Sequence, residues 1–86
     1  MFTYLITYDL NVPGKDYKKL WAAIESIGPY TRPLKSVYFV KSNLTTLQVV
    51  HYLSPHIDSS DGLFITPVSS KTSGGQLPQT FWNWLN

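Results

Sequence analysis

The stretch Met1-Phe-Thr-Tyr-Leu-Ile-Thr-Tyr-Asp-Leu10 decides how the rest of the chain is expected to fold. Eight of its ten residues are aliphatic, aromatic or β-branched, which suits a buried pleated surface, and the run is too short and too β-branched for a convincing helix. We therefore expect the first, central strand of a sheet here. Asp9 would lie at the rim of that strand, within reach of a ligand, and is the candidate functional residue. The alternative is that Asp9 only starts the turn Asp9–Gly14, because aspartate and asparagine bond their own backbone in turns.

An amphipathic helix is predicted over residues 16–27. Its apolar residues recur at helical spacing, and Lys18, Lys19, Glu25 and Ser26 take the opposite face; the apolar positions are Tyr17, Leu20, Trp21, Ile24 and Ile27. Asp16 complements the helix dipole at the start, and Gly28-Pro29 ends the helix.

A hairpin is predicted next, with a short strand over residues 30–33 and a longer one over Ser36-Val-Tyr-Phe-Val40. Pro33 cannot donate to a ladder, so it restricts the short strand to an edge or a bend. Ser42-Asn43 is expected to cap a second helix with apolar positions 46, 49, 50, 53 and 57, which Pro55 ends or tightens. After a polar turn over Asp58–Gly62, residues 63–66 predict a fourth strand that Pro67 terminates.

The predicted order is that of an α+β, ferredoxin-like βαββαβ sandwich over residues 1–68. Such a fold has an antiparallel four-stranded sheet, with the first and third strands central and two helices on one face. The other face would expose apolar side chains, and dimerisation through it is the simplest cover.

Residues 69–86 are predicted to form a linker and a C-terminal docking tail. Ser69–Pro78 is small, polar and glycine-containing, whereas the end of the chain carries the large apolar residues Phe81, Trp82, Trp84 and Leu85. Such side chains at a terminus indicate a docking surface. The tail could pack on its own protomer, on the second protomer of a dimer, or on another protein.

Composition limits the possible classes of protein. With 86 residues, one domain is expected, near the size at which a lone core is marginal, so that oligomerisation is reasonable. The absence of cysteine excludes disulfides and thiolate chemistry. We expect a soluble, cytoplasmic protein, because no signal peptide opens the chain and no apolar run approaches the ~18 residues of a membrane span.

A weak nucleic-acid footprint accompanies the net charge of +2. The candidate phosphate contacts are Lys15, Lys18, Lys19, Arg32, Lys35 and Lys41, and Tyr8 or Tyr38 could stack on bases. Ordinary solvated lysines and core tyrosines are the alternative explanation for the same residues.

Several short motifs resemble those of the small spacer-acquisition protein family of CRISPR systems. They are Tyr8-Asp-Leu10, Arg32 followed by Ser36-Val-Tyr-Phe39, and Asp61 before the fourth strand with Pro67 at its end. Tyr8-Asp-Leu-Asn11, Pro13-Gly-Lys-Asp-Tyr17, Pro33-Leu-Lys-Ser36, Lys41-Ser42 and Trp84-Leu85 are similar to a SinR-like relative. Two features depart from the family: charged residues beside the motif are sparse, and Pro33 interrupts the hairpin.

The resemblance implies a homodimer in which Asp9 of each protomer faces its twin and binds a divalent metal, Mg²⁺ or Mn²⁺, with Ser36 nearby as a supporting group. Some members of that family act as non-catalytic DNA scaffolds, and the related virulence-associated toxin D group cleaves RNA. Two functions therefore stay open: a metal-dependent endonuclease and a non-catalytic binding or scaffold dimer. We favour the second, because the basic surface is thin and each chain has one plausible metal ligand.

Other carboxylates and histidines give weaker signals. Asp58 and Asp61 have serine and glycine neighbours, which favours a capped turn. His51 and His56 are five residues apart and do not share a helix face, so they make a poor ligand pair.

Overall fold

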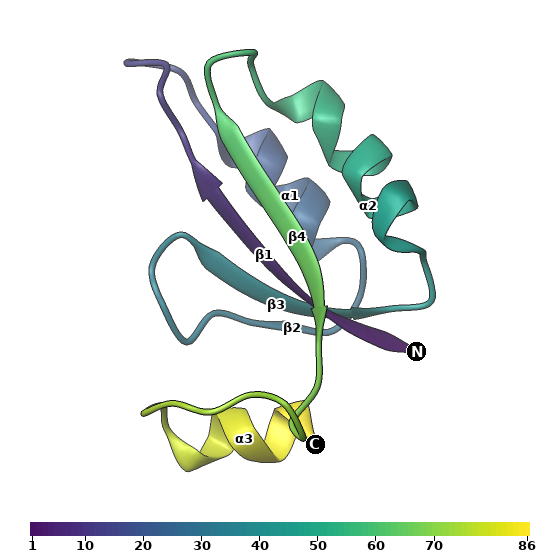
Figure 1. Ribbon diagram of the computed structural model, residues 1–86. Coiled ribbons are helices and arrows are strands. Elements are labelled where there is room, and N and C mark those ends of the chain that lie inside the picture. Colours follow the sequence, from purple (N-terminus) through teal and green to yellow (C-terminus); the bar gives the residue numbers. More distant parts are fainter.

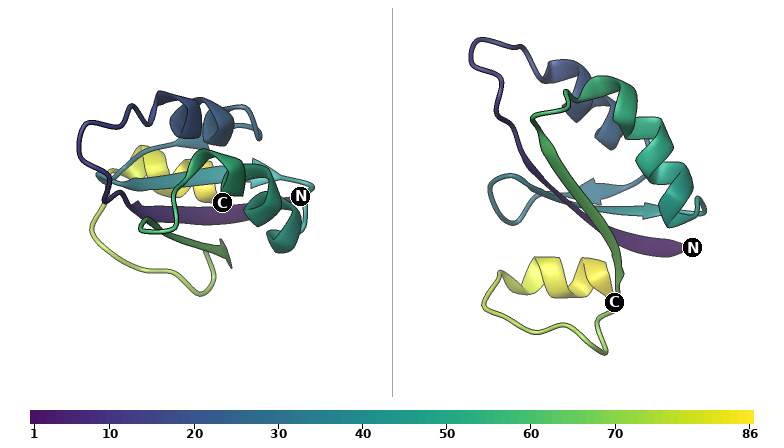
Figure 2. Two further views of the ribbon diagram at one scale, coloured as in Figure 1. Left: turned by 90° about the horizontal axis from the view of Figure 1, so that it is seen from above. Right: turned by 45° about the horizontal axis from the view of Figure 1, so that its top comes forward.

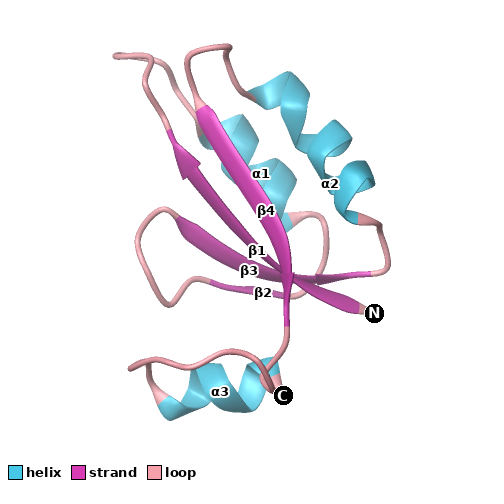
Figure 3. Ribbon diagram, in the orientation of Figure 1, coloured by secondary structure: helices cyan, strands magenta, loops and turns pink.

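The computed structural model describes all 86 residues of the chain. It is an α+β structure, with a four-stranded antiparallel sheet and three α-helices (Figures 1 and 3). The elements are β1 (Phe2–Asp9), α1 (Lys18–Glu25), β2 (Tyr30–Thr31), β3 (Val37–Ser42), α2 (Thr46–Leu53), the 3₁₀ turn η1 (Ser54–His56), β4 (Gly62–Val68) and α3 (Gln79–Leu85).

The strand order is β2-β3-β1-β4, and every neighbouring pair is antiparallel. β1 and β3 are therefore the inner strands, as the sequence predicts from their density of apolar residues. Leu5 of β1 lies opposite Phe39 of β3 and Thr66 of β4, so the pairing fixes which side chains share a face.

One face of the sheet packs against α1 and α2 and forms the main core. Even-numbered residues of β1 and β3 point to this side, because side chains alternate along a strand. The buried members are Tyr4, Ile6, Tyr38 and Val40 from the sheet, Tyr17, Leu20, Ala23 and Ile24 from α1 and the loop before it, and Val49 and Leu53 from α2. The apolar stripe predicted for the first helix is confirmed, although the helix is two residues shorter at each end than predicted.

The opposite face carries α3. Figure 2 shows this helix on the other side of the sheet from α1 and α2. Phe81 and Leu85 are buried against Phe39, and the Phe39 and Phe81 ring centroids are 4.8 Å apart in an edge-on arrangement. The Lys41 ammonium lies 4.5 Å from the centroid of the Trp84 ring. The tail therefore docks on its own sheet, one of the alternatives that the sequence leaves open.

The start of the second helix differs from the prediction. Ser42 is the last residue of β3, and Thr45 caps the helix instead: its side chain accepts a hydrogen bond from Gln48 N, and Gln48 Oε1 accepts one from Thr45 N. This is a reciprocal capping box. Ser42 Oγ accepts from Leu44 N, so it serves the turn between strand and helix. Pro55 tightens the chain into η1, as predicted.

Two strand boundaries also differ from the prediction. β2 ends at Thr31, two residues before Pro33. Pro67 does not end β4, because the strand runs through it to Val68 and Pro67 pairs with Tyr4. β4 is an edge strand, and positions that face away from the single neighbour need no N–H donor.

Candidate functional site

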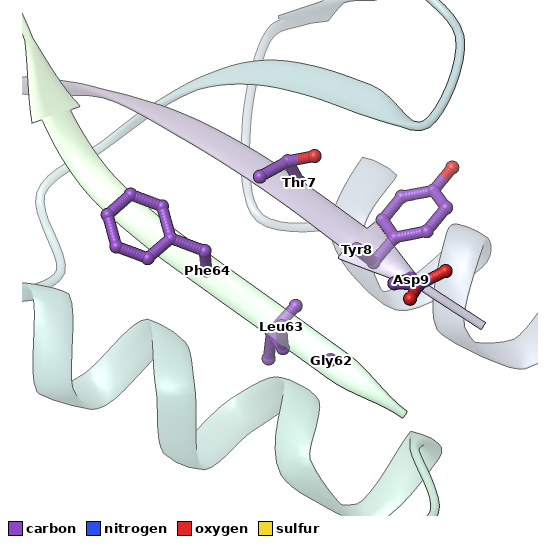
Figure 4. A pocket seen from close by; sticks show the side chains of 6 residues that line it. All are labelled: Thr7, Tyr8, Asp9, Gly62, Leu63 and Phe64. Carbon is purple, nitrogen blue, oxygen red and sulfur yellow. The ribbon is translucent and has the colours of Figure 1, made fainter. Parts of the chain in front are cut away.

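Asp9 is the last residue of β1 and lies opposite Gly62 of β4. Its odd number places it on the α3 side of the sheet, beyond the part that α3 covers. A shallow depression of about 370 Å³ surrounds it (Figure 4). The depression is lined by Thr7, Tyr8, Asp9, Gly62, Leu63 and Phe64.

The Asp9 side chain is exposed and lightly held. Its only side-chain hydrogen bond is a long one of 3.4 Å, donated by Asn11 Nδ2 to Oδ2. It makes no ion pair, because the single ion pair of the chain joins Lys15 to Asp58. The Asp9 carboxylate is therefore free to meet a ligand or a second protein surface.

The depression gives one carboxylate from one chain. No three histidine, aspartate or glutamate side chains gather anywhere in the protein as a metal-binding group would require. The donors in one chain therefore do not fit a magnesium site, because Mg²⁺ needs a near-octahedral set of oxygens. A second Asp9, from another protomer, would be needed.

Phe64 is the feature of this region that sequence reasoning missed. It stands opposite Thr7 on the α3 side of the sheet, and 61% of its surface is exposed. The alternation along β4 could have placed it there, had the register with β1 been known. We call Thr7, Asp9, Gly62 and Phe64 the open strip, because they share the face that α3 leaves uncovered.

Ser36 lies in the β2–β3 turn in the left-handed region, with φ of 56°. Its carbonyl accepts a hydrogen bond of 3.0 Å from Thr7 Oγ1. No hydrogen bond joins the Ser36 side chain to Asp9. Ser36 thus contacts the open strip through its backbone, and the predicted supporting role at a metal remains a prediction.

Five of the six candidate phosphate contacts lie at the Asp9 end of the sheet. Lys15 precedes α1, Lys18 and Lys19 begin it, and Arg32 and Lys35 belong to the β2–β3 turn; the topology brings these segments to the end of β1. Lys41 is the exception, since it lies near the opposite end of the sheet, over Trp84.

Four of the five acidic residues also lie at the Asp9 end of the sheet and partly offset the positive charge of the five cations there. They are Asp9, Asp16, Asp58 and Asp61. Lys15 Nζ is 2.7 Å from Asp58 Oδ2, and this bond raises the pKa of Lys15. Asp16 Oδ1 accepts a hydrogen bond from Lys18 N. Among the cations at this end, Arg32 and Lys35 lie in the one segment that has no carboxylate.

Asp61 ties two loops together, and this confirms the prediction of a capped turn. Its Oδ2 accepts from Asp58 N at 2.8 Å, and Oδ1 accepts from Asn11 N and from the Tyr17 hydroxyl, each at 2.8 Å. Partial burial raises the pKa of the Asp61 carboxyl, but these hydrogen bonds outweigh it and hold the pKa below its ordinary value. Burial, followed by the bond to Asp61, raises the pKa of Tyr17. Asp61 is therefore a structural carboxylate that holds the loop after β1 against the loop before β4.

The remaining predicted residues have structural positions. His51 lies in α2 and His56 in η1, and neither joins a cluster of possible metal ligands. Phe81 and Leu85 of α3 are buried against Phe39 of the sheet, whereas Trp82 and Trp84 are half-buried beside them. Binding of another protein by the tail remains a prediction, and it would use side chains that α3 now packs on the sheet.

None of the helices has the length and apolar character that a membrane crossing requires. No known protein-family model matches the sequence.

Proposed function

We propose that the protein is a small homodimer of ferredoxin-like topology that binds or scaffolds nucleic acid without cleaving it. The order of the elements and the sheet order β2-β3-β1-β4 support the topology. The cations at the Asp9 end support a polyanionic partner. A cytoplasmic location and kinship with the spacer-acquisition and SinR-like proteins belong to the same proposal and rest on the sequence motifs.

The observation that carries the dimer is Phe64. Phe64 is a large aromatic ring that is 61% exposed on the sheet face that α3 leaves uncovered, beside the unpaired Asp9 carboxylate, so it offers apolar surface to a second copy. A second copy, related by a twofold axis at the open strip, would bury both rings. The same packing would bring the two Asp9 residues toward each other.

Sedimentation equilibrium tests this interface with a matched pair of variants. Phe64→Ser is expected to weaken dimerisation about tenfold or more, because it removes an aromatic contact at the centre of the interface. Leu47→Ser is the control, since Leu47 is 64% exposed but lies on α2, on the other side of the sheet. A wild-type chain that stays monomeric at high micromolar concentration, or equal effects of the two substitutions, would refute the interface.

The non-catalytic form is favoured because each chain supplies one carboxylate to the depression. Two carboxylates brought together without a metal repel each other, which weakens the dimer unless they are screened or protonated. A protein that only binds nucleic acid can function with two neighbouring Asp9 carboxylates and no metal ion, whereas hydrolysis at this site would require the metal ion.

A metal-dependent endonuclease is the second candidate, and the unpaired state of Asp9 favours it. Paired Asp9 carboxylates would hold Mg²⁺ or Mn²⁺, with phosphate oxygens and water completing the coordination; a shared ion at ~2.1 Å from each oxygen needs the carboxylates about 4–5 Å apart. The bound ion would polarise the phosphodiester and lower the pKa of a coordinated water.

Cleavage of labelled RNA and DNA by wild type and by Asp9→Asn separates the two functions. An endonuclease loses cleavage with Asp9→Asn and with EDTA while the dimer persists. Absence of cleavage in the wild type with either ion supports the scaffold, and equal cleavage by wild type and Asp9→Asn removes the paired-aspartate endonuclease.

A further inference from the structure

Three tyrosines form a row across the sheet at the end near β2. Tyr38 of β3 is fully buried, with Tyr8 of β1 on one side and Tyr30 of β2 on the other. The ring centroids of Tyr8 and Tyr38 are 6.5 Å apart, and those of Tyr30 and Tyr38 are 5.8 Å apart. Tyr30 is 44% exposed, and β2 is the outermost strand, so its ring borders solvent.

Arg32 is held over this tyrosine row by two contacts. Its guanidinium carbon lies 4.4 Å from the centroid of the Tyr38 ring, and Nη2 donates a hydrogen bond of 3.3 Å to the Tyr8 hydroxyl. The nearest carboxylate in the network, Glu25, accepts a hydrogen bond from the Tyr38 hydroxyl at 2.6 Å and makes no ion pair with Arg32. Arg32 is thus oriented by the Tyr38 ring and the Tyr8 hydroxyl, and it makes no ion pair.

The Tyr38 hydroxyl stays protonated in this arrangement. Burial, followed by the bond to Glu25, raises the pKa of Tyr38 well above its ordinary value. Tyr38 therefore forms no phenolate beneath Arg32 near neutral pH, and its hydroxyl does not neutralise the guanidinium.

A hollow of about 320 Å³ adjoins Arg32 in the β2–β3 turn. It is lined by Arg32, Pro33, Leu34 and Lys35, so it offers two cations and no carboxylate. The cations of the hollow differ in this respect from Lys15, which forms an ion pair with Asp58, and from Lys18, whose backbone N–H is bonded by the Asp16 carboxylate. The turn therefore brings two cations together with no carboxylate among its residues.

We propose that the tyrosine row and the hollow bind single-stranded nucleic acid, with phosphates at Arg32 and Lys35 and a base stacked on Tyr30. Aromatic faces beside cations are the usual means of holding unpaired bases, and they act with little dependence on sequence. A duplex keeps its base faces stacked inside, so it could use only the cations. The inference rests on the proposed nucleic-acid function and names the form of nucleic acid and its place on the molecule.

Fluorescence anisotropy with labelled 12-mers of deoxythymidine and of uridine, and with a duplex of equal length, tests the site. Tyr30→Ser is expected to weaken single-strand binding about tenfold, the usual loss for one stacked base. Tyr52→Ser is its control, because Tyr52 is 46% exposed but lies on α2. Lys35→Gln is expected to reduce the dependence of log K on log salt by about 0.7, the contribution of one single-strand phosphate contact.

Lys71→Gln is the control for Lys35→Gln, since both lysines are exposed and only Lys35 lines the hollow. Tyr30 and Lys35 are exposed, so their replacement leaves the core intact. Arg32 is not replaced in this test, because it covers the buried Tyr38 ring. The ratio of the deoxythymidine and uridine dissociation constants identifies the preferred strand.

The possible failures are distinguishable. If the wild type binds none of the three probes at low salt, the proposed function itself falls. If it binds them but prefers the duplex, or if Tyr30→Ser and Lys35→Gln behave as their controls do, the function stands and this site is wrong.

Discussion

The two faces of the sheet are covered to different degrees. On the α1 and α2 side, Ile6 and Val40 are fully buried and belong to one continuous cluster with both helices. On the other side, one helix of seven residues buries Phe39 but leaves Phe64 61% exposed. The first face determines the fold, whereas the second is open to further contacts.

All three helices are shorter than the about 12–15 residues below which an isolated helix is marginal in water, so each depends on packing against the sheet. They differ in their connections, because α1 and α2 each join two strands, whereas α3 follows the last strand. The segment before it, Ser69–Pro78, joins it to β4 without regular structure. Undocking of the tail and melting of α3 should therefore be one event, separate from unfolding of the main core.

The largest effect is expected from Ile24→Ala on the helix side. Ile24 is fully buried in the main cluster, and removal of such a side chain costs about 2–5 kcal/mol. Urea unfolding followed by far-ultraviolet circular dichroism measures this loss. Leu47→Ala, which is exposed on the same side, should change the stability by less than about 0.5 kcal/mol. A loss for Ile24→Ala as small as that of the control would show that the helix side does not determine the fold.

A smaller, limited effect is expected on the tail side. Phe81→Ala removes the ring packed on Phe39, and we expect a cost of about 2 kcal/mol, below the usual range for a buried phenylalanine because the tail can undock. For the same reason Phe81→Ala combined with Leu85→Ala should cost no more than truncation after Pro78. Additive losses that exceed the cost of truncation would mean that both faces unfold together.

The smallest effect is a change in the acid response of the helix side. The folded-state pKa of Asp61 is lowered, so its contribution to stability is complete above the ordinary aspartate pKa of ~3.9 and is lost as the pH falls through the folded value. Wild type should therefore lose melting temperature more steeply below about pH 4 than Asp61→Asn does. Asp16→Asn is a control from the loop after β1 to which Asp61 is bonded, and parallel curves for wild type and Asp61→Asn would exclude this role.

Local sequence patterns predicted the elements that depend on their own residues. The apolar stripe of α1, the tightening at Pro55 and the turn held by Asp58 and Asp61 all follow from contacts within a few residues. The inner position of β1 also followed, because a strand without polar alternation needs cover on both faces.

Features that depend on distant residues were not predictable. Ser42 and Thr45 are both residue types that cap helices, and the length of β3 decides which of them caps α2. The spacing of Thr45 and Gln48 fits a capping box, so it was a local signal for the observed start of α2. The bond between Asn11 and Asp61 joins residues 50 apart in the chain. In the candidate site, Asp9 was placed correctly at a rim, but the exposure of Phe64 required the register of β1 with β4.

Pro67 has a consequence for how copies of the chain can assemble. The outer edge of β4 has no neighbouring strand, and such an edge invites growth of the sheet from one molecule into the next. Pro67 lacks an N–H, so a strand from another molecule cannot continue its ladder past Thr66. Edge-to-edge growth of the sheet through β4 is thereby disfavoured, which is compatible with the face-to-face pairing proposed above.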